Sequence, residues 1–399
     1  MGKLNCFFAA TLTLLVLVAV TTWPAQAQNF IALHQFDSAG DGAFPEAALV
    51  RDAAGNLYGT TIIGGGGVAG VVFKIDPTGA ETILLRFDVA NGSGPNSPLI
   101  LDQAGNLYGI ANNGPLGGGV IFKLSPSGEQ ALLHSFRKGA NLQPKIPSGG
   151  LFMDKLGNIF GTTRFGGDSS CQTGCGTLFK LNQAGVLSVI HRFVGPEGTQ
   201  PFGPLVQDGD GNLYGVTQVG GDLVCPDALA QGLGCGTVFK FSKKKVLTVL
   251  HTFQGGSDGA IPQAGLLLDA AGNLYGTTGK GGTSENGIIF KVSNGGTYTV
   301  AHRFTGAVDG TTPNGGLVID DAGNLFGTAQ AGGASGMGVA FELSPTGGLT
   351  VLHAFTGDTD GAFPLAGLIR DELGHLFGTT DRDFLPQQIQ GGNVFEIRP

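Results

Sequence analysis

Hydrophobic residues fall in short runs of four to eight along most of the chain, and Gly, Asn, Asp or Pro bounds the runs. One stretch shows four consecutive runs: AGLLLD (264–269), NLYGTT (273–278), GIIFKV (287–292) and TYTVAHRF (297–304). Runs rich in Val, Ile, Phe, Tyr and Thr are typical of β-strands. No segment repeats its hydrophobic residues at the helical period. The pattern therefore predicts an all-β protein made of short strands.

This four-strand unit recurs along the chain, and the phrase Gly-Asn-Leu-Tyr-Gly or a variant of it marks each copy. Its second position falls at Asn56, Asn106, Asn158, Asn212, Asn273, Asn324 and His375. Successive copies stand 50 to 61 residues apart, a period typical of propellers and solenoids. Seven units of four antiparallel strands predict a seven-bladed β-propeller. An open β-solenoid is the alternative.

The two ends of the chain share one unit between them. The last unit stops after its third strand, GNVFEIRP (392–399), whereas the run FIALHQF (30–36) matches the fourth strand LTVLHAF (349–355). We therefore expect the N-terminal strand to complete the last blade. Such closure removes the exposed sheet edges of a linear array, and an open solenoid does not explain the split unit.

Composition sets the first 27 residues apart. Lys3 precedes the apolar run FFAATLTLLVLVAV, and the small-residue sequence AQA ends at Ala27. This order predicts a secretory signal peptide over residues 1–27, with an uncleaved N-terminal anchor as the alternative. The run is shorter than the about 20 apolar residues that span a bilayer. We therefore expect one propeller domain over residues 28–399, secreted, periplasmic or at the cell surface, without membrane insertion of the mature chain.

The charge pattern excludes several partners. The chain is acidic, with a formal net charge of -8, and its one basic run, residues 243–245, lies in an expected hairpin turn. Nucleic-acid binding usually requires a basic surface. We therefore expect that the protein binds neither nucleic acid nor anionic membrane. We also expect it to be a monomer.

Several of these phrases occur in a fixed order in each unit. GNLYGTT, a following GG, GxVFKL and LHxF, in units of about 50 residues, resemble the Gloeo/Verruco (GloVer) tandem repeat of exported bacterial proteins. The resemblance covers nearly the whole chain after the predicted signal peptide. It implies a secreted or surface-associated bacterial propeller-like protein, and it supplies no catalytic residues to transfer.

Four cysteines form two local pairs, Cys171 with Cys175 and Cys225 with Cys235. Both pairs lie between the second and third strands of adjacent units. In an exported protein, an even and locally paired set predicts disulfides. Metal binding by the four thiolates is the alternative.

Six histidines occupy one position of the fourth strand, where the first unit has Leu85. They are His34, His134, His191, His251, His302 and His353. Equivalent outer strands diverge around a ring, so these side chains cannot form one metal site. A structural hydrogen bond within each blade is the favoured role.

Three short stretches match functional motifs only formally. GGSDG (255–259) lacks the helix that follows a serine nucleophile, and GGGGVAG (64–70) lacks a phosphate-binding helix. DGDGN (208–212) lacks the distal glutamate of a calcium loop. No catalytic or metal-binding set follows from them.

The connection from one unit to the next repeats the pattern Asp-Gly-x-x-Pro, which is first a turn signal. A second interpretation is a rim of carboxylates that faces a ligand or a cation. The aspartates concerned are Asp41, Asp258, Asp309 and Asp360.

The connections also differ between the two faces of the predicted disc. Those after the first and third strands are short and alike, whereas those after the second strand and between units vary in length and hold the cysteines. Variable loops on a rigid scaffold usually carry binding. The candidate binding residues in the longest of them are Arg164, Phe165, Asp168, Asp222, Asp227 and Asp381.

We therefore expect an exported binding or scaffold module that uses no cofactor. The partner is expected to be a protein or a cation, because the chain after residue 27 has no tryptophan and the variable loops no tyrosine for stacking on sugars. An enzyme acting on extracellular sugars or lactones is the alternative; it requires carboxylates or histidines on the central channel, where the first strands place aliphatic residues. A purely structural envelope component is the third possibility.

Overall fold

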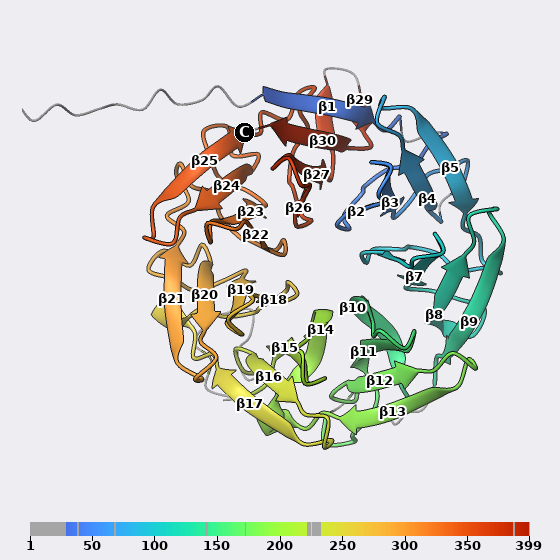
Figure 1. Cartoon of the computed structure of the whole chain (residues 1–399), viewed down its shortest axis with the longest axis vertical. Coiled ribbons are helices and arrows are strands. Elements are labelled where there is room, and N and C mark those ends of the chain that lie inside the picture. The colour runs from blue at the N-terminus through green and yellow to red at the C-terminus, as the bar shows by residue number, and fades with distance from the viewer. Residues whose placement is uncertain are drawn as a thin grey trace, which may run out of the picture.

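The fold is a closed ring of small β-sheets around a central channel (Figure 1). The computed structural model describes residues 29–37, 40–67, 69–139, 143–171, 173–221, 225, 233–385 and 388–398. The predicted signal peptide lies outside these ranges. The described residues form seven four-stranded antiparallel sheets, which confirms the prediction of an all-β, seven-bladed propeller.

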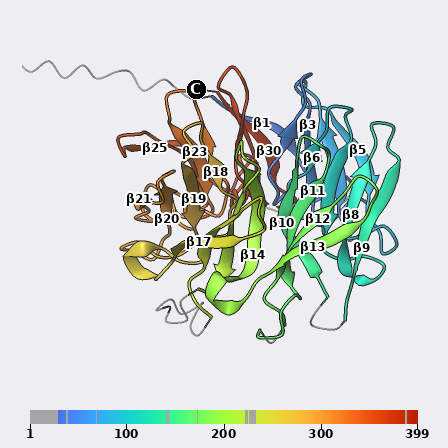
Figure 2. The same ribbon diagram turned by 60° about the horizontal axis from the view of Figure 1, so that its bottom comes forward.

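Each blade runs from an inner to an outer strand, as β10 to β13 show side by side in Figure 2. Blade 1 contains β2 (Val50–Arg51), β3 (Leu57–Thr61), β4 (Val71–Ile75) and β5 (Glu81–Arg86). Blade 2 contains β6 (Ile100–Leu101), β7 (Leu107–Ala111), β8 (Gly117–Leu124) and β9 (Gln130–Arg137). Blade 3 contains β10 (Lys145–Met153), β11 (Ile159–Phe165), β12 (Thr177–Leu181) and β13 (Leu187–Arg192). Blade 4 contains β14 (Thr199–Gln207), β15 (Leu213–Val219), β16 (Thr237–Phe241) and β17 (Leu247–Thr252).

The remaining blades repeat the plan. Blade 5 contains β18 (Leu267–Leu268), β19 (Leu274–Thr278), β20 (Ile288–Val292) and β21 (Tyr298–Arg303). Blade 6 contains β22 (Val318–Ile319), β23 (Leu325–Ala329), β24 (Val339–Leu343) and β25 (Leu349–Ala354). Blade 7 contains β26 (Ile369–Arg370), β27 (Leu376–Thr380), β30 (Asn393–Arg398) and β1 (Asn29–Gln35). The small hairpin of β28 (Asp383–Leu385) and β29 (Gln388–Gln390) interrupts it.

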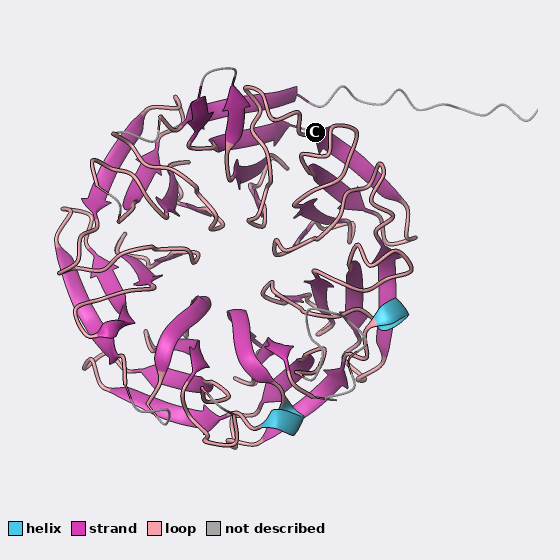
Figure 3. Cartoon of the chain, turned by 180° about the vertical axis from the view of Figure 1, so that it is seen from behind, coloured by secondary structure: helices cyan, strands magenta, loops and turns pink. Residues whose placement is uncertain are grey.

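Helical structure is confined to two short 3-10 turns in the described residues, η1 (Gly195–Glu197) and η2 (Gly256–Asp258), visible at the rim in Figure 3. Within the same ranges, no helix is long and apolar enough to cross a membrane.

The ring closes through strands from opposite ends of the chain. β1 pairs antiparallel with β30, from Asn29 opposite Arg398 to Gln35 opposite Asn393. The strand order in this blade is β1-β30-β27-β26. The N-terminal strand therefore completes the last blade, as the split unit predicted.

The repeated phrase forms the first turn of each blade. In blade 1, Asp52 Oδ1 accepts hydrogen bonds from the backbone N–H groups of Ala54 and Asn56, both at 2.9 Å. Its Oδ2 accepts from Asn56 Nδ2 at 2.7 Å and from the Tyr58 hydroxyl at 2.9 Å. Burial raises the pKa of Asp52, but these hydrogen bonds outweigh it, so the net pKa is lowered. The Asp, Asn and Tyr of the phrase thus form the hydrogen bonds that stabilise the turn.

The glycine that ends the phrase makes room for the core. A Cβ on Gly59 would lie 2.4 Å from the ring of Phe73 on the third strand. Phe73 is fully buried, and the Phe36 ring from the preceding blade packs on it edge to face with centroids 5.0 Å apart. Each blade repeats this arrangement, so the core consists of phenylalanine contacts between neighbouring blades.

Candidate binding site at the mouth of the central channel

One face of the ring carries the connections between second and third strands and those between blades; we call it the loop face. Each connection between blades ends in a residue with positive φ followed by proline. These residues are Phe44, Gly94, Ile146, Gln200, Ile261, Thr312 and Phe363. A left-handed backbone is costly for non-glycine residues and tends to occur where function fixes the chain.

These backbone positions are anchored to the preceding blade. The N–H of Gln200 donates to the carbonyl oxygen of Cys175 at 2.9 Å, and that of Ile261 donates to Cys235 at 3.0 Å. Each cysteine belongs to a disulfide, Cys171–Cys175 or Cys225–Cys235. Both predicted disulfides are thus confirmed, and each holds a loop that positions the next blade at the channel.

The residues after the prolines line a cavity of about 390 Å³ at the loop-face mouth of the channel. All seven blades contribute to its wall. The residue directly after each proline is, in blade order, Glu46, Asn96, Ser148, Phe202, Gln263, Asn314 and Leu365. Asn112 and Arg164 from the ends of second strands complete the polar part of the lining. The wall thus combines amides, one carboxyl group and one guanidinium with apolar side chains.

The predicted residue Arg164 lies in this wall. Its Nε donates to Gln200 Oε1 at 2.9 Å, and its Nη2 donates to Gln218 Oε1 at 3.1 Å. The guanidinium carbon lies 5.4 Å from the centre of the Phe165 ring. Burial lowers the pKa of Arg164, yet arginine stays charged at any physiological pH. The group therefore presents a positioned positive charge to the cavity.

A second charged group lies where the first and last blades meet. Burial, helped by the neighbouring carboxyl group of Asp381 and opposed by the charge of Arg382, raises the pKa of Glu46 to about 7. Asp381 is 2% exposed, and burial raises its pKa as well. Arg382 Nε donates to Asp381 Oδ2 at 2.6 Å, whereas Asp381 Oδ1 is buried without a partner in the described residues.

Asn314 provides an acceptor in the same wall. Its Nδ2 donates to Gln330 Oε1 at 3.0 Å. Its Oδ1 is buried and has no hydrogen-bond partner among the described residues. A buried acceptor without a partner costs free energy unless a ligand or a water satisfies it.

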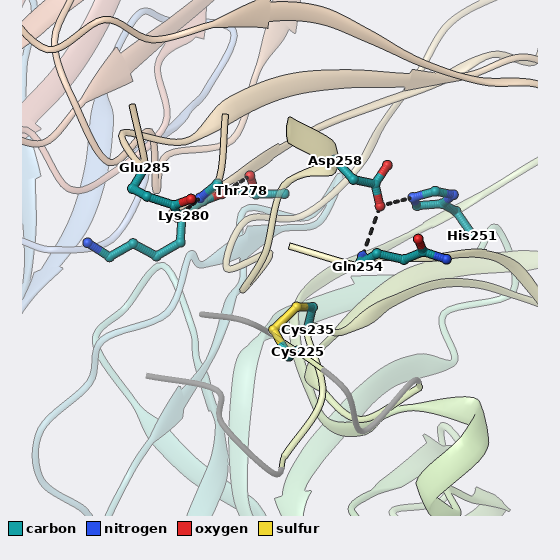
Figure 4. Close-up of a disulfide and its surroundings, with 9 residues drawn as sticks. Cys225, Cys235, His251, Gln254, Asp258, Thr278, Lys280 and Glu285 are labelled. Atoms are coloured by element: carbon teal, nitrogen blue, oxygen red, sulfur yellow. Dashed lines mark hydrogen bonds and ion pairs between the residues drawn. A yellow bond between two sulfur atoms is a disulfide. The ribbon is translucent and has the colours of Figure 1, made fainter. Parts of the chain in front are cut away.

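The four aspartates of the Asp-Gly-x-x-Pro loops lie apart, each in its own loop. Asp258 Oδ2 bonds to His251 Nε2 at 3.1 Å and accepts from the Gln254 N–H at 2.9 Å (Figure 4). Asp41, Asp309 and Asp360 bond in the same way to the fourth-strand histidine of the same connection, at 3.0–3.2 Å. His191 uses Glu197 at 2.9 Å. The structural hydrogen bond predicted for the histidines is therefore present in five blades.

The other candidate residues divide into two groups. Asp168 lies in the described part of the chain and accepts from the Ser170 N–H at 2.8 Å, within its own turn. Asp222 and Asp227 lie outside the described residues. The structure thus brings Arg164 to the channel wall and Asp381 beside Glu46, and leaves Asp168 on the loop.

Sequence reasoning missed most of the channel lining. Aliphatic first strands were expected there, and Leu266, Leu317 and Leu368 do contribute. Polar residues such as Glu46 and Gln263 come instead from the segment before the first strand, because that strand is two residues long in blades such as blade 1 and blade 5. One feature of the sequence could have identified these lining residues. The residue after each repeated proline differs from blade to blade, although the proline itself is constant.

The Gloeobacter/Verrucomicrobia repeat matches residues 19–173 and 228–399, about four fifths of the chain. The chain belongs to this repeat family. No curated protein sequence is similar to it. Membership in the Gloeobacter/Verrucomicrobia repeat family confirms the resemblance seen in the sequence phrases.

Solved structures similar to this family member include two extracellular domains from B. thetaiotaomicron, one assigned to a hybrid two-component system and one to a one-component system. Their TM-scores are 0.57 and 0.55, with 12% and 11% identity over 93% and 91% of this chain. The chain spans 41% and 40% of their lengths. A protein assigned as a 6-phosphogluconolactonase from Bacteroides fragilis has a TM-score of 0.52 and 16% identity, covering 81% of this chain and 86% of that one. At these identities the likeness shows the fold alone.

Proposed function

We propose that this propeller is an exported binding module whose ligand sits in the loop-face mouth of the central channel. The proposed ligand is a segment of a partner protein, with a bound cation as the alternative outcome and a carbohydrate disfavoured. The disulfides support export, because such bonds persist in oxidising compartments. The similar extracellular domains agree with that location.

The set of amide side chains in the cavity wall, Asn314 among them, carries this proposal. Amide side chains such as Asn96 and Gln263 also line the cavity. Amides both donate and accept, so they match the alternating N–H and C=O groups of a peptide. The Arg164 guanidinium adds a fixed site for a carboxylate. The wall therefore offers the small number of oriented polar groups that is typical of binding pockets.

The test is a binding screen with matched variants. A peptide array, a glycan array and a panel of divalent cations are probed with the wild-type chain and with Asn314→Ala and Arg164→Ala. Lys155→Ala, on an exposed turn of the opposite face, is the control. We expect the wild type and the control to bind a common set of peptides and both channel variants to lose it. Binding that survives in both channel variants would overturn the assignment.

One observation favours a second function, hydrolysis of a sugar lactone. The Glu46 carboxyl group, with its pKa near 7, lines the cavity, and a pKa near the working pH suits a general base. The test is hydrolysis of simple sugar lactones by the wild type and by Glu46→Gln. Turnover that is lost in Glu46→Gln would favour the enzyme over the binding module.

A further inference from the structure

The outer end of the junction between blade 7 and blade 1 holds a cluster of possible metal ligands that, within the described part of the chain, no other junction has. His34 on β1 bonds through Nε2 to Asp41 Oδ2 at 3.2 Å, and Glu81 Oε2 from β5 lies 4.0 Å from the same nitrogen. One ligand atom from each of the three side chains lies within 4.8 Å of the others. The side chains are 18%, 17% and 13% exposed, so the cluster is largely shielded from solvent.

The third member distinguishes this junction. The residue in question lies four positions before the fourth-strand histidine of a unit, or before Leu85 in blade 1. In three junctions its side chain contacts the histidine of the preceding blade, and Glu81 beside His34 is one of them. In two junctions this contact is an aromatic stack, Tyr298 on His251 at 3.6 Å and Phe30 on His353 at 4.1 Å. The remaining residues at this position are Gln130, Leu187, Leu247 and Leu349. Glu81 is therefore the one carboxylate among the seven residues at this position. It faces His34, which already has Asp41 as a carboxylate partner.

The Glu81 carboxylate lacks the hydrogen-bond donors and basic side chains that normally offset the cost of burying a carboxylate. Its Oε1 is buried without a hydrogen-bond partner in the described residues. Within those residues, no lysine or arginine nitrogen lies within 4.0 Å of it. The nearby Arg86 donates through Nη1 to the carbonyl oxygens of Gly40 and Gly65, and Asp37 adds a further negative charge. A buried carboxylate is costly unless it is paired or coordinates a metal ion.

The two other side chains are held in place for a shared ligand. Asp41 Oδ1 accepts from the Asp37 N–H at 2.9 Å, which leaves Oδ2 directed at His34. The His34 ring packs edge to face on Phe36, with centroids 4.8 Å apart. Ligand atoms around a tetrahedral zinc ion stand about 3.4 Å apart, given bonds of about 2.0–2.2 Å. The observed spacings require only small movements to reach this geometry.

We propose that His34, Asp41 and Glu81 bind a divalent transition-metal ion, with Zn²⁺ as the probe, and that this ion ties the N-terminal strand to blade 1. Imidazole favours such metals over Ca²⁺ and Mg²⁺, and carboxylates complete the set. The ion would leave at least one coordination position for water. The site belongs to the outer wall of the ring, so it is independent of the proposed channel ligand.

The experiment is calorimetric titration of the chelator-treated chain, purified without a histidine tag, with Zn²⁺. We expect one ion per chain. Glu81→Leu and Glu81→Gln should each weaken binding by about tenfold or more; leucine occupies the same position in three other blades. A melting curve at an excess of Zn²⁺ about a hundredfold above the dissociation constant should shift upward by about 3–5 °C in the wild type and not in Glu81→Leu.

Two control variants separate this site from other binding. His302→Ala removes a histidine–carboxylate pair at a junction whose third position is Leu349, and it should leave Zn²⁺ binding unchanged. Glu46→Gln removes the carboxyl group at the channel and should also retain one ion. Absence of Zn²⁺ binding in the wild type, or undiminished binding in both Glu81 variants, would overturn the proposal.

Discussion

The ring of Phe30 stacks on the ring of His353, with centroids 4.1 Å apart and planes 16° from parallel. Phe30 belongs to β1, the outer strand of blade 7, whereas His353 belongs to β25 of blade 6. Directly after β1, Phe36 is fully buried and packs on Phe73 of blade 1. The N-terminal strand thus completes one blade and contacts both neighbours.

Deleting residues 28–37 should therefore lower the melting temperature by about 10 °C or more, because loss of a buried phenylalanine alone costs about 3–5 kcal/mol. Differential scanning calorimetry measures the shift. Val89→Ala, at a side chain that is 87% exposed, is the control and should leave the curve in place. An unchanged melting temperature in the deletion would contradict ring closure by β1.

The histidine–carboxylate pairs should stabilise the connections between blades. Asp309 accepts from His302 Nε2 at 3.1 Å and also from the Thr305 N–H and hydroxyl groups. We expect His302→Ala to lower the free energy of unfolding by about 1–2 kcal/mol and Asp309→Ala to lower it by about 2–3 kcal/mol, because the aspartate makes more bonds. Urea denaturation measures both. A larger effect of the histidine change would contradict this account.

The architecture followed from the sequence because each blade repeats the same local chemistry. Asp52, Asn56 and Tyr58 form the hydrogen bonds of one turn, and Gly59 leaves room for the Phe73 ring. Every copy of the phrase therefore indicates one blade. The disulfides followed for a similar reason, since their partners are close in sequence. Both features depend on contacts within a few residues or within one repeat.

The channel site did not follow, because it depends on how seven blades converge. Glu46 and Asp381 are far apart in the chain and come together only when the ring closes. The sequence identified Arg164 as a candidate binding residue because it was expected in a long loop. In the structure its hydrogen bonds to Gln200 and Gln218 hold it in the channel wall. The metal cluster at the outer rim also spans the junction of the first and last blades, so no single repeat contains its ligands.

The Glu46 carboxyl group should make stability depend on pH. Its pKa is about 7 in the folded state and about 4.5 in the unfolded state. Below pH 4.5 the group is protonated in both states, and its contribution is fully present. As pH rises through 7 the unfolded state gains the lower-energy ionised form first, so this contribution is lost, by at most about 3 kcal/mol before solvent screening.

Glu46→Gln removes that dependence, so the variant should gain stability over the wild type between pH 4 and pH 8. Chemical denaturation across this range measures the difference, and Glu129→Gln at an exposed turn is the control. A constant difference between Glu46→Gln and wild type at all pH values would contradict the raised pKa.

The two disulfides should stabilise the fold modestly and by different amounts. They close loops with sequence separations of 4 and 10, which corresponds to about 2 and 3 kcal/mol by loop entropy. We expect the double alanine variant at Cys225 and Cys235 to lose more stability than that at Cys171 and Cys175. Urea denaturation measures both losses, and peptide mapping without reduction should find no cross-pairing. Free thiols in the wild type would contradict the pairing.

Blocking the channel mouth tests the proposed binding site most directly. The test uses the chain from residue 28 onward, which lacks Cys6. Its four cysteines, at 171, 175, 225 and 235, are all in disulfides, so Asn314→Cys introduces a thiol that a bulky maleimide can label. Ala54→Cys, on an exposed turn of the opposite face, is labelled in parallel. The peptide array is then probed with both conjugates. Our account predicts that labelled Asn314→Cys loses the peptides bound by the wild type while labelled Ala54→Cys retains them; full binding by labelled Asn314→Cys would contradict it.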